Sequence, residues 1–187
     1  MNGGYIMKRL IAIAVVLFAV TAASNAQYST SSNYRYWTIA PTAGITMPMQ
    51  NLDDRYNSGY NIGVDVGYRM SQSMGVFGNV NYNNLSGEGI NSSANYLEIT
   101  AGPRFFLGGS ANTSAFWIDG GVGAYNLSDG GIGSGPTNAG LTAGIGYSVP
   151  LSETISLMGK GKYNMVFTAN EPTTFSTLSA GVRFILK

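Results

Sequence analysis

The feature that most constrains the fold of this 187-residue chain is a regular alternation of apolar and polar side chains. Between Tyr60 and Met70 every second residue is apolar, and the residues between them are asparagine, glycine, aspartate or arginine. Because successive side chains of a β-strand point to opposite faces, this segment is predicted to be a strand with one apolar face and one polar face. The apolar face would point outward in a membrane barrel and inward in a soluble barrel.

The same alternation recurs along the chain and predicts eight strands. They cover Tyr36–Met47, Gly59–Met70, Gly75–Asn84, Asn95–Leu107, Ala115–Leu127, Ala139–Val149, Thr154–Phe167 and Thr174–Leu186. A transmembrane strand needs about 9–11 residues, whereas the mean strand of a soluble protein has about 5–6. The lengths of the predicted segments are therefore typical of strands that cross a membrane.

The connections between these segments alternate in predicted length. The long ones are rich in glycine, asparagine, serine and aspartate, and they are Met47–Ser58, Leu85–Ala94 and Ser128–Asn138. The short ones are Ser71–Met74, Gly108–Ser114 and Pro150–Glu153, and Thr168–Thr173 is intermediate. Since outer-membrane barrels have short periplasmic turns and longer outer loops, the short connections are predicted to lie in the periplasm.

Almost every charged residue within the segments falls on the polar face. These residues are Asp65, Arg69, Glu98, Arg104, Asp119, Lys160, Lys162 and Arg183. A lysine or arginine on the lipid face at the bilayer midplane would cost about 2–4 kcal/mol, so this face is interpreted as the barrel interior. Because side chains can fill the interior of an eight-stranded barrel, we predict a plug of paired charges and hydrogen bonds. A path that conducts cations or anions is the alternative.

Aromatic residues and glycines support the same assignment of faces. Outward aromatic residues near the segment ends predict a periplasmic girdle of Trp37, Phe105, Phe116, Tyr147 and Phe184, and an outer girdle of Tyr60, Tyr82 and Phe167. Such rings lie at the membrane–water interface. On the inward face of the sixth segment, Gly140, Gly144 and Gly146 are predicted to leave room for larger neighbours.

The N-terminus has the pattern of a secretory signal peptide. Met7-Lys8-Arg9 precedes the apolar stretch Leu10–Val20, and small residues end at Ser24-Asn25-Ala26. We predict export through the Sec pathway and cleavage between Ala26 and Gln27, with translation starting at Met1 or Met7. Residues 1–26 would be the signal peptide, and residues 27–187 would form one barrel domain.

Composition gives no support for catalysis, a metal site or a cofactor. The chain has no histidine and no cysteine, so a Ser–His catalytic pair and the commonest transition-metal ligands are missing. The acidic pair Asp53-Asp54 lacks the spacing of a calcium loop, and the glycine-rich stretch Gly130–Gly135 lacks the ending of a phosphate loop. Only 10% of residues are charged, and the two signs nearly balance, which argues against binding to nucleic acid.

The last segment resembles the C-terminal strand of the small outer-membrane β-barrel proteins of the OmpA/OmpX-like type. Ser179-Ala180-Gly181-Val182-Arg183-Phe184-Ile185-Leu186 matches the signal that the barrel-assembly machinery reads in that family, although many members end on an aromatic residue rather than on Leu186-Lys187. The resemblance implies an eight-stranded antiparallel up-and-down transmembrane β-barrel in the outer membrane of a Gram-negative-type bacterium. It also implies that Gly181, Phe184 and Leu186 belong to the assembly signal.

The favoured function is therefore a non-enzymatic outer-membrane barrel that is surrounded by lipid. Its outer loops would serve membrane integrity or adhesion, and they would meet any extracellular ligand. Two alternatives stay open at this point. One is a narrow channel or transporter for small molecules, and the other is a soluble periplasmic barrel that binds a ligand.

Overall fold

The computed structural model describes residues 34–52, 56–87, 93–109, 113–128, 135–169 and 171–186. The predicted signal peptide and its cleavage site lie outside the described residues, as do Asp53-Asp54 and most of the glycine-rich stretch. In the part of the chain that is described, no helix is long and apolar enough to cross a membrane.

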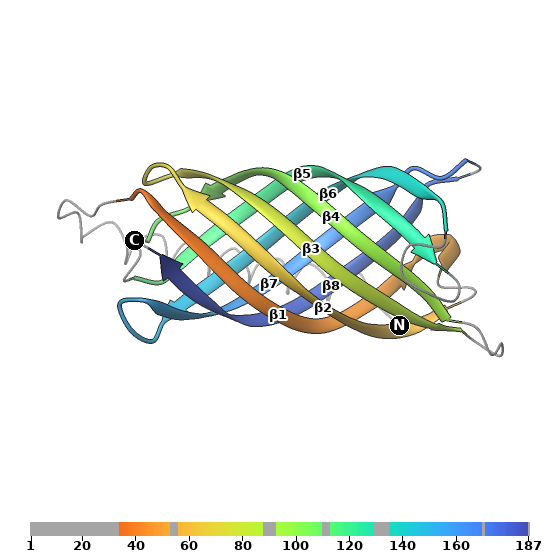
Figure 1. Ribbon diagram of the computed structural model, residues 1–187, viewed down its shortest axis with the longest axis horizontal. Coiled ribbons are helices and arrows are strands. Elements are labelled where there is room, and N and C mark those ends of the chain that lie inside the picture. The colour runs from red at the N-terminus through yellow and green to blue at the C-terminus, as the bar shows by residue number, and fades with distance from the viewer. Residues whose placement is uncertain are drawn as a thin grey trace, which may run out of the picture.

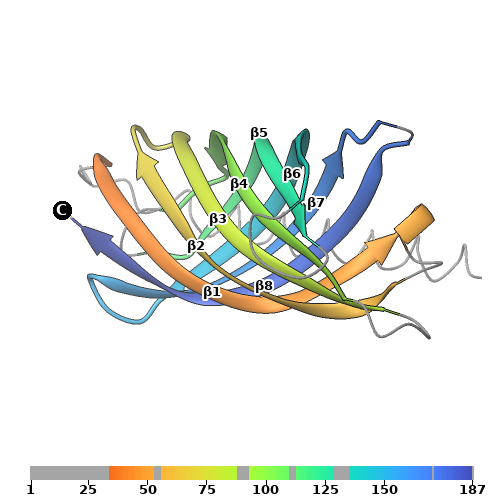
Figure 2. The ribbon, with the colours of Figure 1, turned by 45° about the vertical axis from the view of Figure 1, so that its right-hand side comes forward.

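Eight antiparallel strands form a closed barrel in which each strand pairs with the next and the last pairs with the first (Figure 1). The strands are β1 Tyr36–Met49, β2 Tyr56–Arg69, β3 Met74–Gly87, β4 Ser93–Phe106, β5 Ala115–Ser128, β6 Thr137–Pro150, β7 Ile155–Val166 and β8 Thr173–Leu186. One short 3-10 helix, η1 Gln50–Leu52, follows β1. Figure 2 shows how strongly the strands tilt as they wind around the barrel. The predicted all-β, eight-stranded up-and-down barrel is confirmed.

The two ends of the barrel differ in what they carry. We call the end with Tyr36 and Leu186 the terminal end, and its connections are residues 70–73, 107–114 and 151–154. We call the opposite end the loop end, and its connections are residues 50–55, 88–92, 129–136 and 167–172. The terminal end lies on the left of Figure 1.

Several strands extend further toward the loop end than the sequence pattern predicts. β2 includes Asn57 and Ser58, and β6 begins at Thr137, so the loop-end connections are shorter than predicted. Backbone groups form the ladder whatever the side chain, and beyond the apolar part of the wall the side chains no longer follow the two-residue pattern. In contrast, the connection at residues 107–114 is longer than predicted, so the alternation between long and short connections is weak.

The apolar face of each strand points outward, away from the barrel axis. Ile62 and Val64 are exposed, and Val122 in the middle of β5 has 65% of its surface exposed. On the alternate positions of β2, Asp65 and Arg69 are buried in the interior. This arrangement is the reverse of a soluble barrel, whose outer face is polar.

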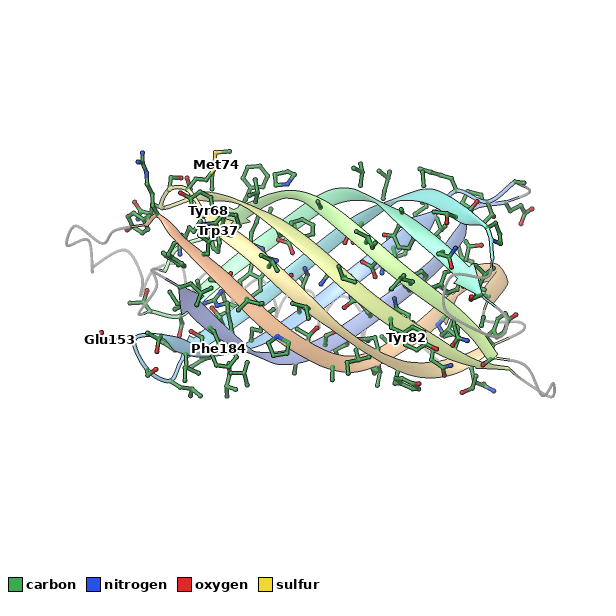
Figure 3. All side chains as sticks on the ribbon, in the orientation of Figure 1. Trp37, Tyr68, Met74, Tyr82, Glu153 and Phe184 are labelled. Carbon is green, nitrogen blue, oxygen red and sulfur yellow. The ribbon has the colours of Figure 1, made fainter. Side chains whose placement is uncertain are left out.

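Outward-facing aromatic residues lie near both ends of the wall. At the terminal end, Trp37 contacts Tyr68 with ring centroids 4.7 Å apart, and Phe116 contacts Tyr147 at 4.3 Å. Figure 3 shows Trp37, Tyr68 and Phe184 near this end and Tyr82 near the other. The residues of these rings stand on the outward face, as a girdle requires.

Candidate functional site in the barrel interior

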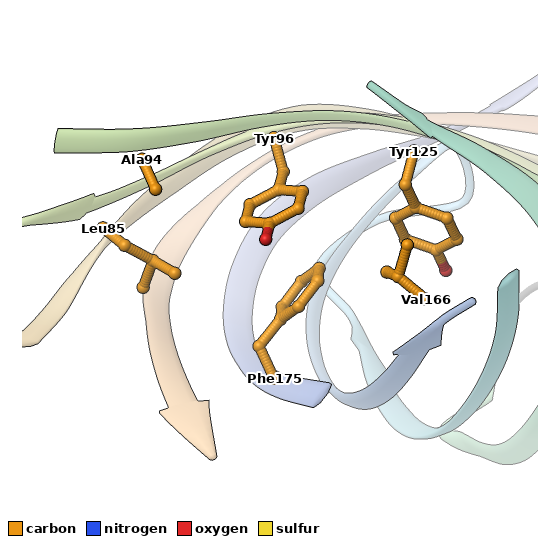
Figure 4. Packing of buried hydrophobic residues seen from close by; sticks show 6 residues of the cluster. All are labelled: Leu85, Ala94, Tyr96, Tyr125, Val166 and Phe175. Carbon is orange, nitrogen blue, oxygen red and sulfur yellow. The ribbon is translucent and has the colours of Figure 1, made fainter. Parts of the chain in front are cut away.

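The interior holds a charged middle layer between two apolar layers. At the loop end, the apolar layer consists of Leu85, Ala94, Tyr96, Tyr125, Val166 and Phe175 (Figure 4). At the terminal end, it consists of Ala40, Phe106, Ala115, Trp117 and Met158. Side chains from strands on all sides therefore fill the barrel at both ends as well as in the middle.

Four of the predicted interior charges form one closed cluster. Arg104 on β4 contacts Asp65 on β2 at 2.9 Å and Asp119 on β5 at 2.7 Å. Lys160 on β7 contacts the same two carboxylates at 3.0 Å and 2.7 Å. Each carboxylate thus meets both cations, and the four formal charges cancel. The cluster spans the interior, because its members come from four different strands.

The guanidinium of Arg104 makes a bidentate pair with each of the two carboxylates. Its two terminal nitrogens donate to the two oxygens of Asp65, while Nε and Nη2 donate to the two oxygens of Asp119. Such bidentate pairs are among the strongest hydrogen bonds in proteins. The ring of Phe77 lies 5.3 Å from this guanidinium and 4.7 Å from the ammonium of Lys160, which adds a favourable aromatic face.

A second ion pair lies next to this cluster, toward the loop end. The ammonium of Lys162 on β7 contacts the carboxylate of Glu98 on β4 and donates to the side-chain oxygen of Asn79 at 2.9 Å. The same carboxylate accepts hydrogen bonds from Thr100 and Asn83. Because every member is buried, this network satisfies an anion that would otherwise destabilise the fold.

The other two predicted interior cations, Arg69 and Arg183, contact no carboxylate among the described residues. Arg69 donates to the carbonyl oxygens of Ser71, Gln72 and Gly109, and its guanidinium lies 4.0 Å from the centroid of the Phe106 ring. It therefore ties two terminal-end connections together. These two arginines leave the described interior with more cations than anions, since three carboxylates face five basic side chains.

The inward aromatic residues of the interior were not predicted from the sequence pattern. Trp117 and Tyr125 on β5 are fully buried, and so is Phe175 on β8. A signal for Trp117 was present, because it stands two residues before the inward Asp119 and so shares its face. Residue type alone does not reveal it, since other aromatic residues of this chain face outward.

Glycines on β6 make room for these rings. The Cβ of an alanine at Gly146 would lie 2.2 Å from the Cζ2 atom of Trp117, and one at Gly140 would lie 2.7 Å from the Cε2 atom of Tyr125. The predicted inward glycines Gly140 and Gly146 therefore leave the space on β6 that the rings of β5 occupy. Gly144, at the third predicted position, stands beside Lys160 and Lys162.

Replacing Gly146 with alanine is expected to lower the free energy of unfolding by about 1–3 kcal/mol, because the new methyl group overlaps the Trp117 ring. Denaturant unfolding of the protein folded in lipid vesicles measures this loss. The matched control is Gly161→Ala, because no atom lies within 4 Å of a Cβ built there. Equal losses in the two variants would contradict the tight fit between Gly146 and Trp117.

The described residues contain no group of three or more histidine, cysteine, aspartate or glutamate side chains that could hold a metal ion. The interior carboxylates are instead paired with arginine and lysine side chains.

Comparison with known protein families identifies the class of this barrel. The family model for the outer membrane protein beta-barrel domain matches residues 11–184. The chain belongs to this family. It is therefore an integral protein of the Gram-negative outer membrane, and its apolar wall faces lipid.

Solved structures share the fold of this barrel. Neisserial surface protein A is 19% identical, with a TM-score of 0.60, and the match covers 80% of this chain and 96% of that one. The outer membrane protein OprG from Pseudomonas aeruginosa is 12% identical, with a TM-score of 0.56, and the match covers 84% and 99%. The N-terminal β-barrel domain of OprF from the same organism is 10% identical, with a TM-score of 0.50, and the match covers 80% and 98%. At these identities the likeness is one of fold. No curated protein matches the chain.

Proposed function

We propose that this barrel is a closed, non-enzymatic scaffold that displays the loop-end connections to the medium outside the cell. The observation that carries the proposal is the filled interior, in which two apolar layers and a neutral ion cluster occupy the barrel along its length. A scaffold of this kind contributes to membrane integrity through its wall and to adhesion or ligand contact through its loops.

The proposed orientation places the terminal end in the periplasm. In support, both ends of the described chain lie there, at Tyr36 and Leu186, and an even number of strands returns the chain to its starting side. On β8, Phe184 and Leu186 face outward in line with one another. This exposed apolar stripe, together with Gly181, is our proposed signal for the barrel-assembly machinery.

Two glutamates at opposite ends test the orientation. Glu171 lies in a loop-end connection and Glu153 in a terminal-end connection, and both are exposed. Because the chain has no cysteine, Glu171→Cys and Glu153→Cys each introduce a unique thiol. A maleimide that cannot cross membranes should label Glu171→Cys on intact cells and label Glu153→Cys only after the outer membrane is permeabilised. The opposite pattern would refute the orientation.

The closed interior is tested on the same purified variants in planar bilayers. No stable single-channel current above background is expected from either. A steady current that responds to a thiol reagent at one end would show a continuous path and would favour a channel over a scaffold.

A barrel with residues 50–55 and 88–92 replaced by short turns should still fold and insert, yet lose any attachment of cells to surfaces that the full protein supports.

A further inference from the structure

The two halves of the barrel repeat a sequence pattern at the same spacing. Ala101-Gly102-Pro103-Arg104-Phe105 near the end of β4 corresponds to Ala180-Gly181-Val182-Arg183-Phe184 near the end of β8. The outward aromatic pairs repeat as well, because Trp37–Tyr68 in the first half corresponds to Phe116–Tyr147 in the second. Their ring planes meet at 36° and 35°. Arg104 and Arg183 therefore occupy equivalent positions in an approximate two-fold arrangement.

The partners of these two arginines are not equivalent. Arg104 lies between the carboxylates of Asp65 and Asp119. In the other half, the positions that correspond to these two acids are held by Gly144 and Ala40, since Ala40 pairs with Asp65 in the first half as Asp119 pairs with Gly144 in the second. Arg183 therefore occupies the position equivalent to Arg104, but neither of the two equivalent partner positions carries a carboxylate.

Several hydrogen-bonding groups in and around Arg183 have no partner among the described residues. Arg183 is only 3% exposed, and its Nη2 atom donates to the Ser148 hydroxyl at 2.7 Å. Its Nε atom, the Nε1 atom of Trp117 and the Oγ atom of Ser156 are buried and make no hydrogen bond within the described part of the chain.

Ser156 and Trp117 are both neighbours of Arg183. Ser156 is the cross-strand neighbour of Arg183, and the guanidinium lies 5.6 Å from the centroid of the Trp117 ring. Three buried groups of this kind, one of them on the cation itself, are unfavourable unless something accepts hydrogen bonds from them. Two of the three, the arginine and indole N–H groups, can only donate, and the serine hydroxyl can donate too.

We propose that the terminal end of the interior binds a small monovalent anion between Arg183, Trp117 and Ser156, and that chloride is its simplest form. One guanidinium charge balances one negative charge, and up to three N–H and O–H donors surround it. The anion would supply Arg183 with a negative charge, as Asp119 does for Arg104 in the other half of the barrel. A divalent anion would exceed the single positive charge of this site.

The direct test is crystallisation of the intact barrel from bromide in place of chloride, followed by anomalous diffraction. An anomalous peak within hydrogen-bonding distance of both Arg183 Nε and Trp117 Nε1 is the expected result. An interior without such a peak, or with bromide only on the outer surface, overturns the proposal.

A second measurement follows the thermal unfolding midpoint in chloride and in a bulky anion at equal ionic strength. Binding to the folded state raises the midpoint with each tenfold increase in chloride. Arg183→Gln removes the cation and should abolish this rise, and Ala40→Asp supplies the missing internal carboxylate and should abolish it as well. The control Arg69→Lys should keep the rise. A chloride-dependent rise that persists in Arg183→Gln would assign the effect to another part of the protein.

Discussion

Replacing Arg104 with glutamine is expected to lower the free energy of unfolding by about 3–5 kcal/mol. The substitution leaves the buried carboxylates of Asp65 and Asp119 to share the single ammonium of Lys160. An uncompensated charge in a water-excluded interior is strongly unfavourable. Glutamine also cannot make bidentate hydrogen bonds to both carboxylates, as the guanidinium does. Urea titration of the protein folded in lipid vesicles, followed by tryptophan fluorescence, gives the value.

Arg183→Gln is the matched control for this prediction, because Arg183 occupies the equivalent position in the second half and contacts no carboxylate of the residues that the structure describes. Its loss of stability should be clearly smaller. The double variant Arg104→Gln with Asp119→Asn should recover part of the loss, since it removes one of the stranded anions. If both arginine variants lost the same amount and the double variant recovered nothing, the carboxylate cluster would not be the source of the stability.

Replacing Val122 with lysine is expected to destabilise the barrel in lipid by about 2–4 kcal/mol. Val122 lies in the middle of β5 and is the most exposed of the large apolar residues on the outer wall, so the new ammonium would face the hydrocarbon at mid-height. Unfolding titrations in vesicles, compared with heat-modifiable migration on gels, report the change.

The control for this second prediction is Leu151→Lys. Like Val122, Leu151 is an exposed apolar residue, with 61% of its surface exposed. It differs in position, because it lies in the terminal-end connection between β6 and β7. A lysine near the interface costs only about 0–1 kcal/mol, so the two substitutions differ by depth alone. Equal effects at the two positions would place the membrane boundary elsewhere on the wall.

The faces of the strands were predictable from the sequence, because lipid penalises every outward charge. That constraint acts residue by residue, so the alternation between Tyr60 and Met70 assigns Asp65 and Arg69 to the interior without knowledge of the fold. The same constraint ends where the lipid ends. The extension of β2 to Asn57 and of β6 to Thr137 was not predictable, since these residues pair through their backbones outside the apolar part of the wall.

The partners of the interior charges were not predictable either. The contact of Asp65 with Lys160 joins β2 to β7 across the barrel, and it depends on the tilt of the strands and on the stagger between them. The spacing of residues along the chain does not indicate how far neighbouring strands are staggered. The fit of Trp117 against Gly146 similarly depends on the register of two neighbouring strands, although the inward direction of Trp117 follows from its distance to Asp119.

The distribution of the ion cluster over the two halves has a consequence for how the protein enters its membrane. Asp65 and Arg104 come from the first four strands, Asp119 and Lys160 from the last four, and each acid meets a base from either half. Glu98 and Lys162 also join opposite halves. A chain with only one half inserted would leave Glu98 or Lys162 in hydrocarbon without its partner, so we expect the two halves to cross the bilayer together, without a long-lived half-inserted intermediate.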